Sequence, residues 1–138
     1  LHYAAANEND TGVKFILEEQ GIEIECCDRN GCTPLHYAAR EGQIKAVELL
    51  FNRCTEKHPR DHEGHTPLHL AVEHAHFQVI KWLIENGNAE INCVDNSNRT
   101  PLTIAYNLNN TEEKQRILQY FEMLENVTLQ SEDLPMEV

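Results

Sequence analysis

A short apolar motif recurs along this chain at an almost constant interval, and this interval is the strongest constraint on the fold. The four copies begin at Leu1, Leu35, Leu68 and Leu102, which are 34, 33 and 34 residues apart. Three copies read Leu-His-x-Ala, and the last reads Leu-Thr-Ile-Ala. Self-similarity at a period of roughly 20 to 50 residues predicts a stack of like units instead of one closed globule.

Turn-forming residues precede each motif at a fixed distance. Asp28 and Gly31 come just before Thr33-Pro34, and the two later units repeat this order, with Asn98 in place of Gly in the last. Gly and Asn tolerate a positive φ, and Asp bonds its own nearby backbone. Thr caps a helix, and Pro fits its first position. We therefore expect hairpin-like loops, each followed by a short helix of about eight residues. These helices begin at Pro34, Pro67 and Pro101 and are capped by Thr33, Thr66 and Thr100.

A second helix is predicted in every unit. Apolar residues after Gly42 and after Ala75 follow a 3.6-residue spacing, and the stretches 13–17 and 117–124 continue the pattern in the first and last units. One helix pair cannot bury its apolar face alone, so the pairs must stack. The sequence therefore predicts an all-α solenoid of about four helix-turn-helix repeats.

The Thr-Pro-Leu-His-x-Ala sequence at this period resembles the ankyrin repeat over about residues 1–124. The resemblance implies repeats at 1–27, 28–60, 61–94 and 95–124. The first repeat lacks the seven residues equivalent to 28–34, so we expect the chain to be a fragment of a longer array. The last repeat has Thr103 where the motif has His, and we interpret it as a divergent repeat and a candidate C-terminal cap.

The stretch 125–138 has neither the period nor any basic residue, which predicts a flexible acidic tail. An alternative is that its apolar residues dock as a short peptide against the last helix pair. These residues are Val127, Leu129, Leu134 and Met136.

Composition argues against several classes of function. The 138 residues include 23 acidic and 11 basic side chains, a net charge of −12 that disfavours nucleic acid as a partner. Residues 29–110 are nearly neutral, with 9 acidic and 8 basic side chains, so the excess charge lies at the two ends. No segment is apolar enough to be a membrane span.

The five cysteines, an odd number, favour free thiols in a reducing compartment. We expect an intracellular protein in the cytoplasm, or alternatively the nucleus. As a fragment it should be monomeric, without a cofactor or direct membrane contact.

The histidines divide into two groups. His2, His36 and His69 occupy the motif position, where the resemblance implies imidazoles that bond within and between repeats. His62 and His65, with His58 just before them, lie on one loop and are interpreted as solvated residues. Two ligands three residues apart without a Cys-x-x-Cys pair are poor support for zinc, so no metal site is expected.

The cysteines also differ by position. Cys26 and Cys93 occupy equivalent positions where a small buried side chain is the simplest interpretation. Cys32 lies at the variable tip of its loop, and if exposed it could be oxidised or alkylated. Neither a nucleophile with its base nor a phosphate-binding loop is recognisable, so we expect no enzymatic activity.

The residues that the repeat leaves variable predict a partner-binding surface. Tyr3, Tyr37, Leu70 and Ile104 occupy equivalent positions in successive units, and such aromatic and aliphatic groups are typical interface anchors. The alternative is that this row is partly buried between adjacent helices. The remaining candidates for partner contact are Arg40 and His74 on the helices and Arg29, Cys32, His62, His65 and Arg99 on the loop tips.

We therefore predict a protein-binding module that uses the concave face and loop tips of stacked repeats. One alternative is a regulatory segment of the cytosolic ankyrin domain of a TRP-type channel, with cysteine-based sensing. Another is a pathogen or toxin array that binds a host protein. The resemblance also implies a candidate site of asparagine hydroxylation at Asn92.

Overall fold

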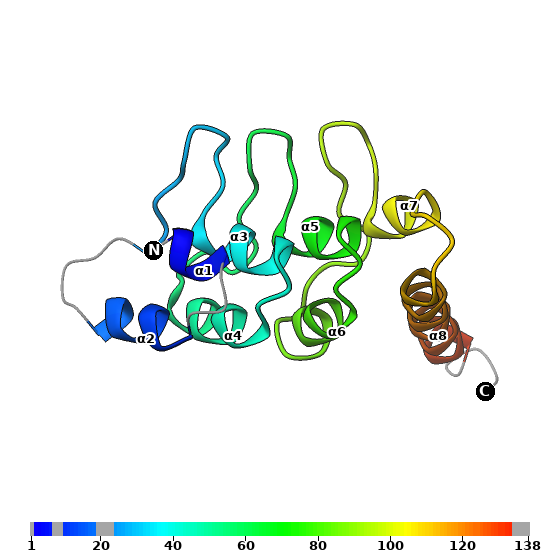
Figure 1. The fold of residues 1–138 in the computed structure, drawn as a ribbon. Helices are drawn as coiled ribbons and strands as arrows, with labels where there is room; N and C mark the ends of the chain where they lie inside the picture. Colours follow the sequence, from blue (N-terminus) through cyan, green and yellow to red (C-terminus); the bar gives the residue numbers. More distant parts are fainter. Residues whose placement is uncertain (1, 7–9, 19–23, 134–138) are drawn as a thin grey trace.

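The computed structural model describes residues 2–6, 10–18 and 24–133. Within this part of the chain all regular structure is helical, and eight helices follow one another in four pairs (Figure 1). Their bounds are α1 His2–Ala6, α2 Asp10–Glu18, α3 Pro34–Arg40, α4 Ile44–Arg53, α5 Pro67–Glu73, α6 Phe77–Glu85, α7 Pro101–Tyr106 and α8 Glu112–Asp133. The predicted all-α solenoid of four helix pairs is confirmed.

The Thr-Pro motifs begin α3, α5 and α7 as predicted. Thr33 Oγ1 accepts a hydrogen bond from the backbone N–H of His36, and the Thr33 N–H donates to His36 Nδ1 at 3.0 Å. Thr66 and His69 repeat this reciprocal cap. The arrangement is a capping box in which an imidazole takes the part usually played by Glu or Gln.

The loops between helix pairs turn as their residues dictate. Asp28 Oδ1 accepts the backbone N–H groups of Asn30 and Cys32, each at 2.9 Å. Gly31 and Gly64 have φ of 76° and 80°, and Asn98 takes the same position at 61°. Asn98 therefore replaces Gly as predicted.

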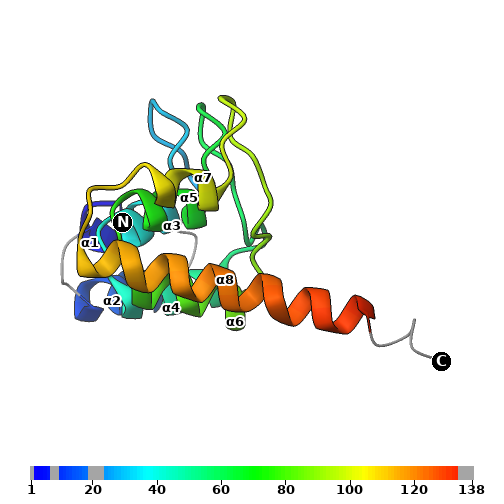
Figure 2. The ribbon, with the colours of Figure 1, turned by 90° about the vertical axis from the view of Figure 1, so that its right-hand side faces the viewer.

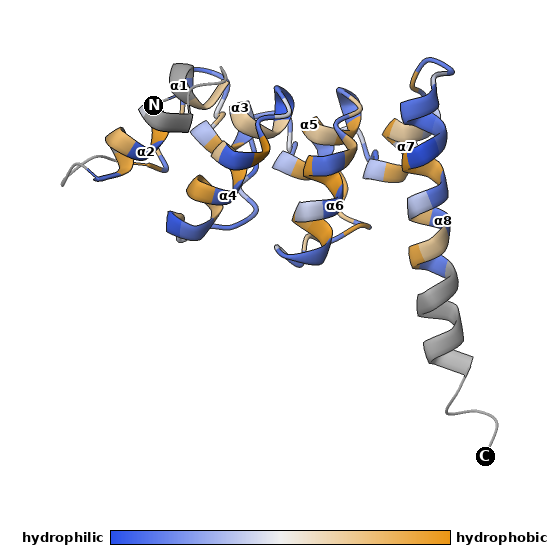
Figure 3. Ribbon diagram, turned by 60° about the horizontal axis from the view of Figure 1, so that its bottom comes forward, coloured by the Kyte–Doolittle hydropathy of each residue, from blue (hydrophilic) through white to orange (hydrophobic). Residues whose placement is uncertain are grey.

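The helices form two rows. Helices α1, α3, α5 and α7 pack in sequence along one row, and α2, α4, α6 and α8 along the other (Figure 1). The amphipathic second helices show alternating hydrophobic and hydrophilic segments (Figure 3). Their apolar faces meet the first helices in a continuous core that includes Leu35, Leu50, Leu68, Ile80, Leu83, Ile117 and Phe121. The loops project together from one side of the stack (Figure 1).

The prediction of a flexible tail from residue 125 was wrong as far as Asp133. Helix α8 runs without interruption from Glu112 to Asp133 and extends past the other helices (Figure 2). This stretch contains no Gly or Pro, and its many Glu, Gln and Leu residues favour helix regardless of their charge. The first proline comes at Pro135, and a residue before proline avoids the helical conformation. Residues 134–138 lie outside the described part of the chain, as do the side chains of 126–133, so the docking alternative for Leu134 and Met136 is untested.

Candidate functional site

The motif histidines form a ladder that ties each repeat to the next. The Nε2–H group of His36 donates to the carbonyl of His65 at 2.9 Å, and that of His69 to the carbonyl of Arg99 at 3.1 Å. His2 is joined in the same way to the carbonyl of Cys32, at 3.0 Å. His36 and His69 thus make the expected bonds within and between repeats, and His2 makes the bond to the next repeat. Thr103 bonds Thr100 at 3.0 Å instead, so this ladder ends at the last repeat.

Hydrogen bonding keeps the imidazoles of His36 and His69 neutral. In His36 and His69, Nδ1 accepts a backbone N–H while Nε2 donates to a carbonyl, which is the pattern of an uncharged ring. Both rings are fully buried, and this burial lowers their pKa below the usual histidine value. These residues therefore hold the scaffold together and are not available to a ligand.

Backbone hydrogen bonds join the loop tips to one another. The N–H of His62 donates to the carbonyl of Asn30, and the N–H of Asn96 donates to the carbonyl of Glu63, both at 2.9 Å. The side-chain amide of Asn96 also donates to the carbonyl of His62. The three tips consequently form one continuous wall beside the first helices.

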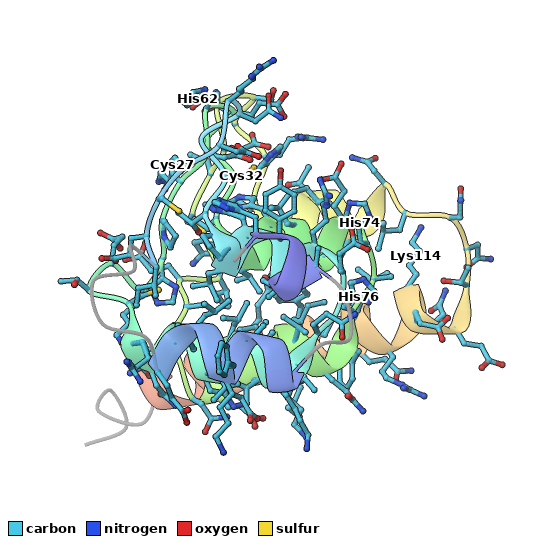
Figure 4. All side chains as sticks on the ribbon, turned by 60° about the vertical axis from the view of Figure 1, so that its left-hand side comes forward. Cys27, Cys32, His62, His74, His76 and Lys114 are labelled. Carbon is cyan, nitrogen blue, oxygen red and sulfur yellow. The ribbon has the colours of Figure 1, made fainter. Side chains whose placement is uncertain are left out.

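A groove of about 390 Å³ lies between this wall and helices α3 and α5. We call it the tip–helix groove. Figure 4 shows His62 at the tips and His74 beside the helices, with Cys32 at a level between them in this view. The groove is lined by Asn30, Cys32, Asp61, His62, Glu63 and His65 from the tips and by Arg40, Leu70, Glu73 and His74 from the helices.

His65 does not lie in solvent, so the prediction of a solvated residue was wrong there. Its ring is 4% exposed, and Nδ1 lies 3.4 Å from Asp61 Oδ2. On the other side Nε2 lies 3.2 Å from both Asp95 Oδ2 and the Arg99 guanidinium. The ring thus bridges the second and third loops. His62 is exposed as predicted, whereas His58 is half-buried with Nε2 donating to the carbonyl of Gly87 at 2.9 Å.

The aspartate that begins the third loop is part of the same network. Burial by itself would raise the pKa of Asp95. The backbone N–H groups of Arg99 and Ser97 and the Arg99 guanidinium outweigh this effect and hold the pKa below its usual value. The cluster of His65, Asp95 and Arg99 was missed in the sequence, although one regularity could have pointed to it. The position four residues after the loop aspartate carries Cys32, His65 or Arg99, all of which can interact with a carboxylate.

Cys32 does not fit a redox or electrophile sensor. Its side chain is 8% exposed, with Sγ 3.8 Å from Asp61 Oδ2. Burial, together with the Asp28 and Asp61 carboxylates, raises the pKa of the Cys32 thiol to about 11. Reactive cysteines require the opposite shift. The exposed-tip interpretation fails because the next loop packs over this position.

The other thiols fall into three environments. Cys27 is exposed. Cys26 and Cys93 are half-buried, so the prediction that they are small buried side chains is only partly correct. Cys54 is buried, and this burial, with the Glu25 carboxylate, raises the pKa of its thiol to about 11.

The predicted ladder of interface anchors is largely buried. Leu70 and Ile104 are 6% and 3% exposed, because these positions pack between neighbouring first helices. Tyr37 is half-buried, its hydroxyl donates to Asp28, and its ring meets His2 edge-on at 5.4 Å. The side chain of Tyr3 lies outside the described part of the structure. The alternative, a partly buried row, is therefore correct for the described members.

The remaining candidates are more accessible. Arg29 and His74 are exposed, and Arg40 and Arg99 are half-buried. Asn92 is exposed in a turn ahead of the third loop. Among the described residues, no group of three His, Cys, Asp or Glu side chains has a geometry that could hold a metal ion, and no helix is long and apolar enough to cross a membrane.

Comparison with known proteins agrees with the repeat architecture. The family model for ankyrin repeats, in three copies, matches residues 1–95 and 54–130. The transient receptor potential cation channel subfamily A member 1 of Homo sapiens is 32% identical over 119 residues, which are 86% of this chain and 11% of that protein. A putative ankyrin repeat protein of Rickettsia bellii is 36% identical over 90 residues, 64% of this chain and 50% of that protein.

A third relative is a subunit of a larger assembly. The 26S proteasome non-ATPase regulatory subunit 10 of Dictyostelium discoideum is 40% identical over 76 residues, 54% of this chain and 33% of that protein. The chain thus spans half or less of each of these three proteins. Matched along nearly its whole length, the chain belongs to the ankyrin-repeat family, whose repeats are a generic, typically non-enzymatic module for binding other proteins.

Proposed function

We propose that this chain binds a partner protein inside the cell through the tip–helix groove and the loop tips beside it. The observation that carries the proposal is the groove itself. One of its walls is braced by backbone hydrogen bonds between loops, and the other by packed helices. Binding to a preformed surface avoids the entropic cost of ordering that surface.

The contact residues of this proposal differ from a simple row along the first helices. Exposed side chains on the two walls, His62 and Glu63 on one and Glu73 and His74 on the other, are free to meet a partner. Leu70 and Cys32 form the floor. The Tyr37 ring packs against the guanidinium of Arg40, whose Cζ lies 4.8 Å from the ring centre, and so helps to position this wall residue.

A paired substitution tests this function. We expect His62→Ala combined with His74→Ala to weaken capture of the partner by about tenfold, since truncation at two wall positions removes contact area from both sides of the groove. Affinity capture from cell extract, followed by titration of the captured protein, measures the effect. The matched control is Asn52→Ala with Gln78→Ala, two exposed positions on α4 and α6. Equal binding by the two variants would refute the proposal.

The similarity to the channel subunit favours a second candidate. It covers 86% of this chain, so the four repeats can be a segment of the cytosolic ankyrin domain of a TRP-type channel, where they would serve in regulation. Reading the full coding sequence tests this candidate. A downstream group of apolar membrane-spanning segments would support it, and a stop codon soon after Val138 would contradict it.

Asn92 remains a candidate for hydroxylation. Its exposed side chain stands in a turn where an enzyme could reach it. Intact-mass measurement of protein isolated from cells would show one added oxygen, and that oxygen would be absent from an Asn92→Ala variant.

A further inference from the structure

We propose that the tip–helix groove selects partner segments that carry basic side chains and releases them on acidification. This inference rests on the proposed function, because it names the chemistry of the partner that would occupy the same groove. Its basis is the set of charged and titratable groups that line the two walls.

Carboxylates dominate the groove at neutral pH. Three acidic residues line it against one arginine, a formal charge of −2. Glu63 and Glu73 are exposed on opposite walls, so a cationic side chain entering between them could meet both. Asp61 is turned inward, where its Oδ1 accepts the N–H groups of Glu63 and His65.

The single arginine does little to offset these carboxylates. Arg40 Nε lies 3.2 Å from Glu41 Oε1, and its guanidinium stands over the Tyr37 ring. An acidic partner segment would therefore find the groove's one cation already paired, and would face Glu63 and Glu73 as well. Charge complementarity favours a basic segment instead.

Two exposed imidazoles make this preference dependent on pH. His62 and His74 lie on opposite walls of the groove, and histidine is the side chain that gains a charge between pH 8 and 5. Protonation of both would change the formal charge of the lining from −2 to 0. The attraction for a basic segment would then be lost.

His65 also lines the groove but is not part of this pair. It faces Asp61 and Glu63 from its own loop, Asp95 from the next loop and the His69 ring of α5, and its Nε2 accepts a hydrogen bond from the Arg99 guanidinium at 3.2 Å. His74 stacks on His76 with ring centres 6.5 Å apart and follows Glu73. His62 is exposed at the tip beside Gly31 and precedes Glu63. A glutamate is thus the sequence neighbour of each of the two exposed histidines.

The experiment uses the intact chain and two short peptides with blocked ends, in which serine alternates with arginine or with glutamate. At pH 7.5 we expect the arginine peptide, and not the glutamate peptide, to shift the backbone amide resonances of Asn30, Glu63 and Leu70. Glu63→Gln with Glu73→Gln should weaken this binding by about fivefold, and a change to pH 5.5 should weaken it at least as much in the unaltered protein.

The control separates a specific site from the general negative charge of the chain. Glu112→Gln with Glu113→Gln removes the same charge from exposed positions in the first turn of α8. An equal loss of affinity in this control would overturn the inference, as would equal binding of the glutamate peptide or no change at pH 5.5. If partner capture needs His62 and His74 but the groove shows no preference for arginine, the proposed function stands and the inference fails. If neither His62 and His74 nor the arginine peptide has an effect, both fail.

Discussion

The buried histidines of the motif set a pH limit on the stability of this fold. His36 and His69 are neutral in the native state, and burial lowers their pKa. In the unfolded chain they would take up protons near the ordinary histidine pKa of about 6.5. Above that pH neither state binds the proton, so their contribution is complete. As the pH falls below it, the unfolded state binds more protons, and the free energy of unfolding must decrease.

Replacing one of these rings should change both stability and its pH dependence. We expect His69→Thr, which copies the natural Thr103, to lower the free energy of unfolding by about 2 to 3 kcal/mol at pH 7.5, because the carbonyl of Arg99 loses its donor and a cavity remains. Its loss of stability between pH 7.5 and 5.5 should be smaller than in the unaltered chain. Urea denaturation at both pH values measures this. An equal loss of unfolding free energy between pH 7.5 and 5.5 in the variant and in the unaltered chain would contradict the assigned role.

At this scale the capping and turn residues could be predicted from spacing within one repeat. The inter-repeat bonds of the motif histidines followed only from the resemblance to the ankyrin repeat. The burial of loop residues by the next repeat was missed. Thr33 and Asp28 act on atoms within a few residues, so their roles follow from spacing. The burial of Cys32 and His65 depends on how closely the next loop packs. No pattern within one unit reports that distance.

The loop tips depend on a conformation that most residues avoid. Gly64 has φ of 80°, and a Cβ at this position would lie 2.6 Å from Asn96 Oδ1 of the next loop. Glycine is therefore needed both for its backbone angle and for the close approach of the neighbouring tip.

A pair of opposite substitutions tests this requirement. Gly64→Ala should lower the free energy of unfolding by about 2 to 3 kcal/mol, since alanine adds left-handed strain to a steric contact. Asn98→Gly, at the equivalent position with φ of 61°, should change it by less than about 0.5 kcal/mol in either direction. Chemical denaturation of both variants gives the comparison. Similar losses in the two would show that φ does not decide the effect.

Helix starts could be predicted from the sequence more reliably than one helix end. The Thr-Pro pairs mark the first residues of α3, α5 and α7 because capping is a local interaction. The end of α8 was misplaced because its acidic composition was interpreted as disorder. A helix ends where something stops it, and no Gly or Pro occurs between Glu112 and Asp133.

At the scale of the whole molecule, stability comes from contacts between neighbouring pairs. The described contacts of α8 with the core involve Ile117, Tyr120 and Phe121, with Leu124 packed beside them. The three buried residues lie in its first half, and Leu124 lies just past its midpoint. The two-row architecture was predictable because the apolar spacing requires each pair to have a neighbour. The tip–helix groove could not be predicted, because it depends on the distance between the loop tips and the first helices, and these were predicted separately.

Truncation separates the two halves of α8. We expect a chain ending at Glu125 to keep its melting temperature within about 2 °C, because the core residues of α8 remain. Extending the truncation to remove Phe121, which is 2% exposed, should lower stability by about 3 to 5 kcal/mol. Calorimetry of both chains is the measurement. A large loss in the shorter truncation would show that residues beyond Glu125 stabilise the fold.

The backbone bonds between loop tips also limit how such an array can diversify. All three loops have six residues from Asp to Thr, and the one extra residue of the third unit lies outside the tip. An insertion within a tip would shift the His62 N–H away from the Asn30 carbonyl and break the register with the following loop as well. Exposed tip side chains such as those of Arg29 and His62 are free to vary because the backbone bonds between tips involve only main-chain atoms. New binding specificities in this scaffold should therefore arise by substitution of tip residues at constant loop length. A combinatorial library built on it should likewise vary the tip residues and keep the loop length.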